Sequence, residues 1–354
     1  MRKLICICLA LVLLGICAAS AEGKIIPVSD QVTIPKVVPQ DHAAPEGESP
    51  LTGLKDSGEP YTPIMLPIDN SPEGHPLWGI GDASVLFQVP LKDNGGTRLV
   101  ALFGDTYPEQ AGGVRSARMS ILPLAKAYSA VFAYAGMPPI QTGPVSVDTW
   151  LTEFGYRKPT RHYSLLGGQY RERVSFVKDP HNLSAHVKEL HDHIAKRKMN
   201  FEDRAFLFTD EPLDTGEKAV TVSVEYQNHK NPAKTSPNSA GTFTYVPGTG
   251  YLRTGESGEM TDRTTGEAVP FANVIIMRVS VEWEKGYPYY TDQMRGSGQA
   301  DIFQSGRYIR GAWLHPDYAD RLVFLDETGK ELTFQRGKTF IVLGDEIIVS
   351  YDEQ

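Results

Sequence analysis

Two arginines stand shortly after a pair of glycines in residues 112–118, which read GGVRSAR. The guanidinium groups of Arg115 and Arg118 could each hold a carboxylate or a phosphate through parallel hydrogen bonds. A glycine turn that leads into a helix near Ser116 would add free backbone N–H groups and a partial positive charge. The motif therefore predicts capture of an anion. Alternatively, the arginines pair with internal acids such as Asp69 or Asp105 and fix the turn.

Further polar side chains stand where predicted elements begin or end. His181 and Asn182 directly precede a predicted helix over residues 183–198, and His181 could also act as a general base. Asp69 and Asn70 end a predicted strand, where they could orient a ligand or a water molecule. The candidate ligand-binding residues are Arg115, Arg118, His181, Asn182, Asp69 and Asn70.

A stripe of His186, Glu189 and His193 on the predicted helix offers side chains that zinc accepts. The spacing is not H-E-x-x-H, and the stripe lies beside the apolar face of the helix, so we expect no metal site. The sequence holds no phosphate-binding loop, dinucleotide fingerprint or G-x-S-x-G elbow. We therefore expect no cofactor.

The first 21 residues have the three parts of a secretory signal peptide. Two basic residues precede an apolar run over residues 4–16, and small residues lead to a cleavage site after Ala21. The apolar run is too short to span the roughly 30 Å hydrocarbon core of a membrane, so we expect no transmembrane span. The alternative is a lipid anchor on Cys17, but Ile16 replaces the small residue expected before a lipidated cysteine. We favour cleavage after Ala21 and an extracytoplasmic protein that is secreted or associated with the cell envelope.

The 354-residue chain has a net charge of −8, and its leader contributes only Arg2 and Lys3, so the remainder carries −10. An acidic surface repels nucleic-acid phosphates, and the longest basic run is residues 196–198, so we expect no nucleic-acid partner. All three cysteines lie in the leader. Without the leader, the chain has no thiol for catalysis, disulfides or metal binding.

The pattern after the leader predicts an α+β protein. Residues 22–62 contain six prolines and predict a Pro-rich tether. Short apolar runs alternate with helical patterns over residues 63–215, which predicts a mixed α/β domain. Residues 219–350 contain strand-like runs separated by Gly and Asp turns, which predicts a β-rich domain.

Six short segments resemble those of the YerB-like bacterial extracytoplasmic lipoprotein family, a domain of unknown function numbered 3048. The segments are residues 50–54 (PLTGL), 66–70 (LPIDN), 112–118 (GGVRSAR), 180–183 (PHNL), 273–276 (NVII) and 337–340 (GKTF). The resemblance implies a two-domain extracytoplasmic protein, often a lipoprotein in Gram-positive bacteria, and it supplies no activity. It also implies an acid where Gln88 stands, so this chain departs from the family pattern there.

Our leading hypothesis is an exported cell-envelope protein that binds an anionic ligand through its Arg/His/Asn site. The ligand would be an anionic small molecule, a cell-wall fragment or an envelope protein that presents carboxylates. The first alternative is a hydrolase or lyase acting on the cell wall, with His181 as general base and the arginines stabilising an oxyanion. The second alternative is a structural assembly partner, in which the arginines are paired with internal acids.

Overall fold

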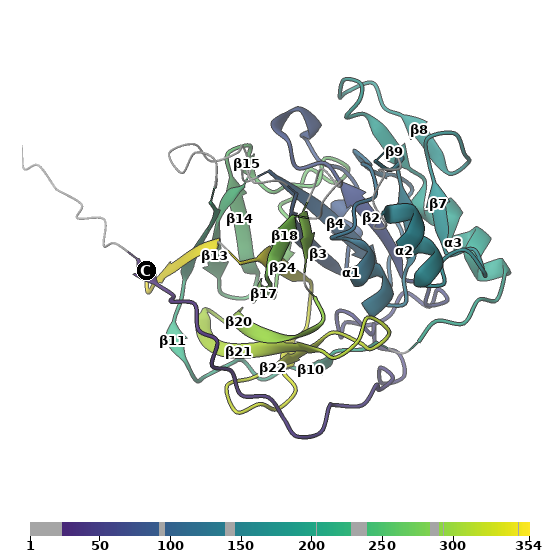
Figure 1. Ribbon diagram of the computed structural model, residues 1–354. Coiled ribbons are helices and arrows are strands. Elements are labelled where there is room, and N and C mark those ends of the chain that lie inside the picture. Colours follow the sequence, from purple (N-terminus) through teal and green to yellow (C-terminus); the bar gives the residue numbers. More distant parts are fainter. Residues whose placement is uncertain are drawn as a thin grey trace, which may run out of the picture.

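The computed structural model describes residues 23–91, 96–138, 146–202, 204–227, 239–283, 290–292, 294–345 and 347–354. The predicted signal peptide, its cleavage site and Cys17 therefore lie outside the described residues. The described chain is mostly strand, with short helices beside the strands of its first half (Figure 1).

The elements up to residue 209 include all three α-helices. The helices are α1 (Leu122–Ala127), α2 (Val147–Glu153) and α3 (Val187–Lys196), with 3-10 turns η1 (Pro72–Gly74) and η2 (Ile80–Asp82). The strands are β1 (Lys24–Ile25), β2 (Ile64–Ile68), β3 (Val85–Pro90), β4 (Thr97–Phe103), β5 (Ala111–Gly112), β6 (Val131–Tyr134), β7 (His162–Ser164), β8 (Arg171–Arg173), β9 (Leu183–Ala185) and β10 (Leu207–Thr209).

The rest of the described chain contains strands and turns. The strands are β11 (Glu217–Lys218), β12 (Thr221–Tyr226), β13 (Ala240–Val246), β14 (Gly250–Gly255), β15 (Gly258–Glu259), β16 (Pro270–Phe271), β17 (Asn273–Arg278), β18 (Val281–Trp283), β19 (Tyr290–Asp292), β20 (Gly296–Gln304), β21 (Arg307–His315), β22 (Val323–Leu325), β23 (Thr333–Gln335), β24 (Thr339–Gly344) and β25 (Ile347–Asp352).

One 11-stranded sheet runs through both halves of the chain, in the order β11-β21-β20-β17-β24-β3-β4-β2-β6-β7, with β22 paired to β21. The halves join where β24 pairs in parallel with β3, so that Phe340 lies opposite Leu86. The sequence predicts a separate mixed α/β domain in the first half, and this is not confirmed, because its strands complete a sheet with those of the second half. Strands β2, β3 and β4 are buried along their whole length, which explains their continuous apolar sequences.

A second sheet has the order β1-β25-β12-β13-β14-β15, with β16 paired to β14. Its strand β12 alternates buried and exposed residues, as expected when one face packs on a core and the other meets solvent. The apolar core includes Phe243 and Phe271 of this sheet together with Phe340 of β24. Ring centroids of Phe271 and Phe340 lie 5.1 Å apart, so the two sheets pack directly on each other.

The described part of the proline-rich segment does not extend away from the body as a tether. Lys24 and Ile25 pair with β25, and Ile26 and Leu51 are buried in the core. The Arg321 guanidinium donates to the Gln40 carbonyl at 2.9 Å. Proline disfavours regular strands, yet it leaves the backbone carbonyls free to accept hydrogen bonds from the body.

Two predicted helix starts are wrong. Ser116 does not cap a helix: α1 begins at Leu122, where Pro123 suits the first turn because its missing N–H would have no helical partner. Ser184 also lies outside a helix, since it belongs to β9, and α3 begins only at Val187. Residues 183–185 form a strand because they pair with both β5 and β8.

Candidate functional site

Three short elements bring the GGVRSAR and PHNL motifs together. Strand β5 ends at Gly112 and pairs in antiparallel fashion with β9, so Gly112 lies opposite Ser184. The end of β2 joins them, because the Asp69 N–H donates to the Gly113 carbonyl at 2.8 Å. Asp69, Arg115 and His181 therefore meet, although they come from distant parts of the sequence.

The two glycines of the motif allow close approach of backbones. A Cβ on Gly113 would lie 2.0 Å from the His181 carbonyl oxygen, and one on Gly112 would lie 2.6 Å from that of Leu183. No side chain larger than hydrogen fits there without moving the backbone. The glycine pair thus allows the segment that contains His181 to pack closely against the segment that contains Arg115.

Asp69 is the centre of the group. Its side chain is only 4% exposed, and one carboxylate oxygen, Oδ2, lies 2.6 Å from His181 Nδ1 and 3.2 Å from Arg115 Nε. The other oxygen, Oδ1, accepts a hydrogen bond from the Ser71 N–H at 3.0 Å. Arg115 also donates to the Pro180 carbonyl at 3.1 Å. An internal acid thus pairs with Arg115, as the structural interpretation of the motif expects.

The pKa of Asp69 is lowered from its ordinary value of 3.8. Burial acts in the opposite direction and raises it, but the positive charges of Arg115 and Arg98, the Ser71 N–H and the bond to His181 together outweigh burial. Asp69 is therefore ionised at neutral pH. Two arginines act on this one carboxylate.

Several backbone N–H groups of the motif already donate to carbonyls and are not free to bind an anion. Those of Val114, Arg115 and Ala117 donate to the carbonyls of Leu183, Pro67 and Gly136 at 2.7, 2.9 and 2.9 Å. Because no helix starts at Ser116, the partial positive charge of a helix N-terminus is missing as well. The anion site that the sequence predicts at a helix N-terminus is therefore not formed, and the candidate donors are side chains.

The structure separates Arg118, Asn70 and Asn182 from this group. Arg118 is buried and donates to the Ala117 carbonyl at 2.7 Å. Asn70 is buried and donates to Thr97 Oγ1 at 2.7 Å. Asn182 donates to the Val174 carbonyl at 3.1 Å and accepts from Arg173 at 2.6 Å. Of the six predicted site residues, Arg115 and His181 both contact Asp69.

His181 has one ring nitrogen committed and one uncommitted. Nδ1 contacts Asp69, with Ser71 Oγ at 3.4 Å, whereas Nε2 has no hydrogen-bond partner among the described residues. The side chains of His181 and Arg115 are 18% and 26% exposed. The group can therefore present an imidazole nitrogen and a guanidinium edge to solvent.

The histidine stripe of α3 does not assemble a metal site in the described structure. His186 contacts Glu189 at 3.2 Å, while the His193 ring packs 5.3 Å from that of Tyr170. A different trio, Glu59, His191 and Asp192, brings its ligand atoms within 4.8 Å of one another. Lys188 Nζ already lies 3.4 Å from Glu59 and 2.5 Å from Asp192.

Both nitrogens of His191 in this trio are also occupied. Nδ1 lies 3.0 Å from Asp192, and Nε2 lies 3.0 Å from the Pro60 carbonyl. The ammonium of Lys188 supplies the charge that a metal ion would otherwise supply. The trio is an ion-pair network, which needs no metal for its charge balance.

Sequence reasoning missed one residue, Arg253, which is 4% exposed on β14 and lines a cavity of about 430 Å³. Its nearest polar side chain is that of Gln88, whose Oε1 lies 3.4 Å from Arg253 Nη2. The alternation of Tyr251, Leu252 and Arg253 could have revealed it, since period-two spacing turns Arg253 to the same face as buried Tyr251. The many glycines nearby suggested turns instead.

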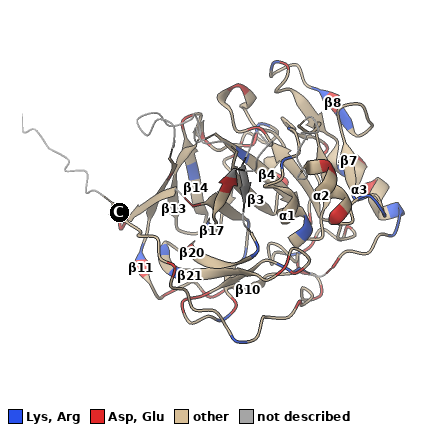
Figure 2. Cartoon of the chain, in the orientation of Figure 1, with Lys and Arg blue, Asp and Glu red and all other residues tan. Residues whose placement is uncertain are grey.

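Charges of both signs are interspersed along the described chain (Figure 2). In this view the basic residues do not gather at one place on the described chain. In the part of the chain that the structure describes, no helix is long and apolar enough to cross a membrane.

Family models match both halves of the chain. Residues 51–200 match the N-terminal domain of a protein of unknown function, DUF3048, and residues 232–341 match the C-terminal domain of the same family. The chain therefore belongs to the DUF3048 family. The family resemblance of the sequence motifs is confirmed, and the two matched regions fit a two-domain layout.

A relative from Bacillus subtilis (strain 168), named "Putative lipoprotein YerB", is 25% identical over 309 residues. The match covers 83% of this chain and 85% of the relative. The crystal structure of YerB protein from Bacillus subtilis is similar with a TM-score of 0.68 at 23% identity, and covers 86% of this chain and 99% of that one. The structural likeness supports the fold.

Proposed function

We propose that this protein is exported to the cell envelope and binds an anionic ligand there through Arg115 and His181. The observation that carries the proposal is the exposed guanidinium and imidazole held above one buried carboxylate. Arg98 and Arg115 both act on Asp69, so fixed positive charge exceeds negative charge at this point. A carboxylate on a cell-wall fragment or an envelope protein would find the guanidinium donors of Arg115 already positioned. The imidazolium form of His181 would add a donor at Nε2 while its Nδ1–H donates to Asp69.

The site differs from the predicted one in its composition. Arg118 and Asn182 donate to backbone carbonyls, and Asn70 donates to the Thr97 side chain. Asp69 orients the two groups that face solvent. We infer that recognition depends on side-chain donors at the surface, with the Asp69 carboxylate fixing their geometry.

Binding of soluble, carboxylate-rich peptidoglycan fragments tests the proposal. Arg115→Gln and His181→Gln are each expected to weaken binding about tenfold or more. Arg197→Gln is the matched control, since Arg197 is an exposed arginine at the end of α3. Equal binding by all four proteins would contradict the proposal.

A second function is favoured by the contact between Asp69 and His181 Nδ1. A carboxylate that accepts the Nδ1 proton leaves Nε2 of a neutral imidazole as a base, which suits a hydrolase or lyase. Incubation of the same fragments with the protein separates the two functions. Turnover that His181→Gln abolishes would establish the enzyme, and unchanged fragments would leave binding alone.

Export is supported by the leader sequence, and envelope attachment by the relative named as a lipoprotein. The mass of the mature N-terminus distinguishes the two forms of export. A chain that begins after Ala21 is a released protein, whereas a diacylated chain beginning at Cys17 is a lipid-anchored one.

A further inference from the structure

Arg253 is a buried cation whose donors are poorly satisfied. It lies on β14, with its side chain on the inner face of the sheet, where burial lowers its pKa to about 10. Within the described chain it makes two long hydrogen bonds, both from Nη2, to Gln88 Oε1 at 3.4 Å and the Ala240 carbonyl at 3.3 Å. Its buried Nε has no partner, although a guanidinium offers five donors.

No carboxylate of the described chain forms an ion pair with Arg253. By contrast, the buried guanidinium of Arg278 lies 2.9 Å from Asp301. A buried charge that lacks a counter-charge costs free energy, so natural proteins rarely keep one without a use. At neutral pH Arg253 remains protonated, because its lowered pKa is still well above 7.

The sheet makes room for this guanidinium with two glycines that face each other. Gly241 on β13 lies opposite Gly255 on β14. A Cβ on Gly241 would lie 2.8 Å from Arg253 Nη2, and one on Gly255 would lie 3.0 Å from Nη1. The rings of Phe243 and Phe340 flank the guanidinium, with centroids 5.9 and 5.7 Å from its central carbon.

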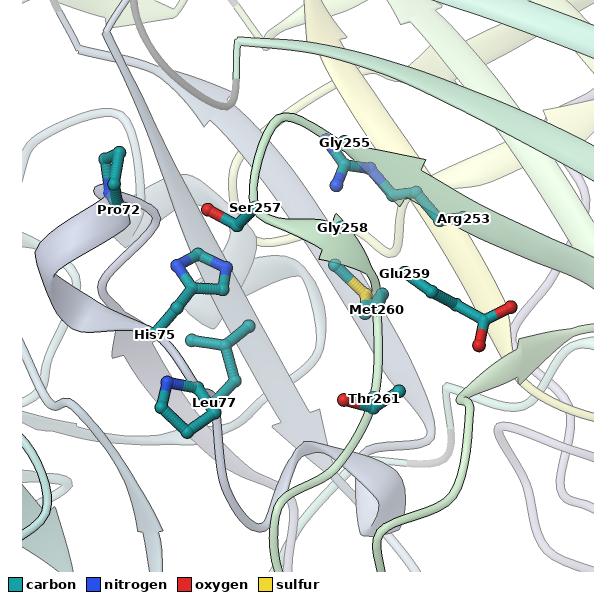
Figure 3. A pocket seen from close by; sticks show the side chains of 11 residues that line it. Pro72, His75, Leu77, Arg253, Gly255, Ser257, Gly258, Glu259, Met260 and Thr261 are labelled. Carbon is teal, nitrogen blue, oxygen red and sulfur yellow. The ribbon is translucent and has the colours of Figure 1, made fainter.

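The guanidinium lines a cavity of about 430 Å³ between the β14–β15 turn and the segment around η1. Figure 3 shows Arg253 reaching toward the turn near Gly255, with the His75 ring and Met260 across the cavity. Leu77 and Met260 are buried and give the wall an apolar part. Glu259 is the acid among the lining residues; it is exposed, and its carboxylate points away from His75 in the same view.

We propose that this cavity is a binding site for an organic carboxylate, which pairs with the Arg253 guanidinium. A carboxylate carries the single negative charge that balances one arginine, and its two oxygens match two donors of the guanidinium. The apolar wall suits the carbon body of such a ligand better than it suits inorganic phosphate. The volume is ample for a short chain.

This site is independent of the proposed Arg115–His181 surface. That surface presents an arginine already paired to Asp69, whereas the cavity presents an arginine without a carboxylate. Failure of the surface to bind peptidoglycan fragments would leave the cavity site intact, and the reverse also holds. Their variants are therefore tested separately.

The test uses butyrate as the carboxylate probe, with inorganic phosphate and chloride compared at equal ionic strength. Saturable stabilisation is measured as the rise in Tm of the whole protein with probe concentration. Arg253→Met removes the charge and keeps an unbranched side chain. Gln88→Glu keeps Arg253 but places a competing carboxylate beside it, in a side chain of the same shape. Arg263→Met is the control, because it removes one exposed arginine.

Butyrate is expected to raise the Tm of the native protein and of Arg263→Met. Both Arg253→Met and Gln88→Glu are expected to raise the apparent Kd for butyrate at least about tenfold. The Gln88→Glu variant keeps the test decisive if Arg253→Met fails to fold. No saturable shift with butyrate would overturn the proposal, as would an equal shift in all variants. A shift with phosphate alone would overturn the assignment of a carboxylate.

Discussion

Arg115 and Arg253 show what a neighbouring carboxylate does to an arginine. Arg115 is partly exposed and lies 3.2 Å from Asp69 Oδ2, in the motif that the sequence makes most conspicuous. Arg253 is buried, and its side-chain partner is the uncharged Gln88. Arg115, in the conspicuous motif, therefore has a partly structural role because it pairs with Asp69. Arg253, in a strand that the sequence does not mark, carries a positive charge that no carboxylate of the described chain balances.

The comparison separates two uses of positive charge. An arginine with its own acid contributes to the fold and binds further anions less strongly, because part of its charge is already balanced. An arginine held without an acid costs stability and gains most from an anionic ligand. The following variants test whether the paired and the unpaired arginines differ in their contribution to stability, as their contacts indicate.

The largest effect is expected from Asp301→Asn, which removes the carboxylate that pairs with the buried guanidinium of Arg278. Arg278 Nε and Nη2 lie 3.0 and 2.9 Å from Asp301 Oδ2, and both side chains are buried. Loss of one partner of such a pair lowers the free energy of unfolding by about 3–5 kcal/mol. Urea denaturation measures the change; a loss below about 1 kcal/mol would show that the pair does not stabilise the fold.

Asp69→Asn is expected to have the next largest effect. It leaves Arg115 without the carboxylate that it contacts, removes a negative charge that interacts with Arg98, and weakens the contact that orients His181. Because Arg115 is partly exposed, the expected loss is about 2–3 kcal/mol, less than for Asp301→Asn. A variant as stable as the native protein would mean that Asp69 serves binding rather than the fold.

Gly241→Ala tests the space reserved for Arg253. The added Cβ would lie 2.8–2.9 Å from the guanidinium and displace it. The free energy of unfolding should therefore fall by about 1–3 kcal/mol, and butyrate binding should weaken. Gly167→Ala is the control, since a Cβ there meets nothing within 4 Å. Equal Tm and equal butyrate binding in the two variants would show that Gly241 does not hold this space.

Acid should weaken the Asp69 group selectively. The folded protein holds the pKa of Asp69 below 3.8, so the unfolded chain takes up this proton at a higher pH than the folded one. This contribution to stability is present above pH 3.8 and is lost as the pH falls through the folded pKa. Native protein and Asp69→Asn, unfolded in urea at several pH values, should therefore converge in stability below that range. A constant difference between them would contradict the assignment.

The smallest change in stability is expected from Arg253→Met. It removes a buried charge without a carboxylate partner among the described residues, but it also removes a donor to the Gln88 and Ala240 oxygens. These costs oppose each other, so the free energy of unfolding should stay within about 1 kcal/mol of the native value or rise. A loss as large as that of Asp301→Asn would make Arg253 a structural residue.

The sequence predicts the elements best where local pattern and packing agree. Residues 64–68 form β2 in the region where the sequence predicts short apolar strands, because five successive residues are buried between neighbouring strands. The pairing of β24 with β3 could not be predicted, since it joins residues some 250 positions apart in the sequence. Both strands are mostly apolar and buried, so their side chains do not specify which strands pair. Strand β24 ends at Gly344, which has a φ of 152°, a backbone conformation that favours glycine.

The candidate site was predictable only in part. The motifs locate Asp69, Arg115 and His181, but spacing cannot show that the N–H groups after the glycines are used by other carbonyls. Arg253 was missed because its meaning depends on Gln88, Gly241 and Gly255, which three separate strands bring to one place. Charge balance around a side chain is a property of the fold and cannot be read from neighbours in sequence.

The most direct test of the account is a crystal structure of the native protein soaked in butyrate. The account predicts a carboxylate within hydrogen-bond distance of the Arg253 guanidinium, with its carbon chain against Leu77 and Met260. A cavity that holds no butyrate, in a crystal where the carboxylate binds Arg115 instead, would contradict it. Such a result would show that the paired arginine is the binding residue and the buried one is part of the fold.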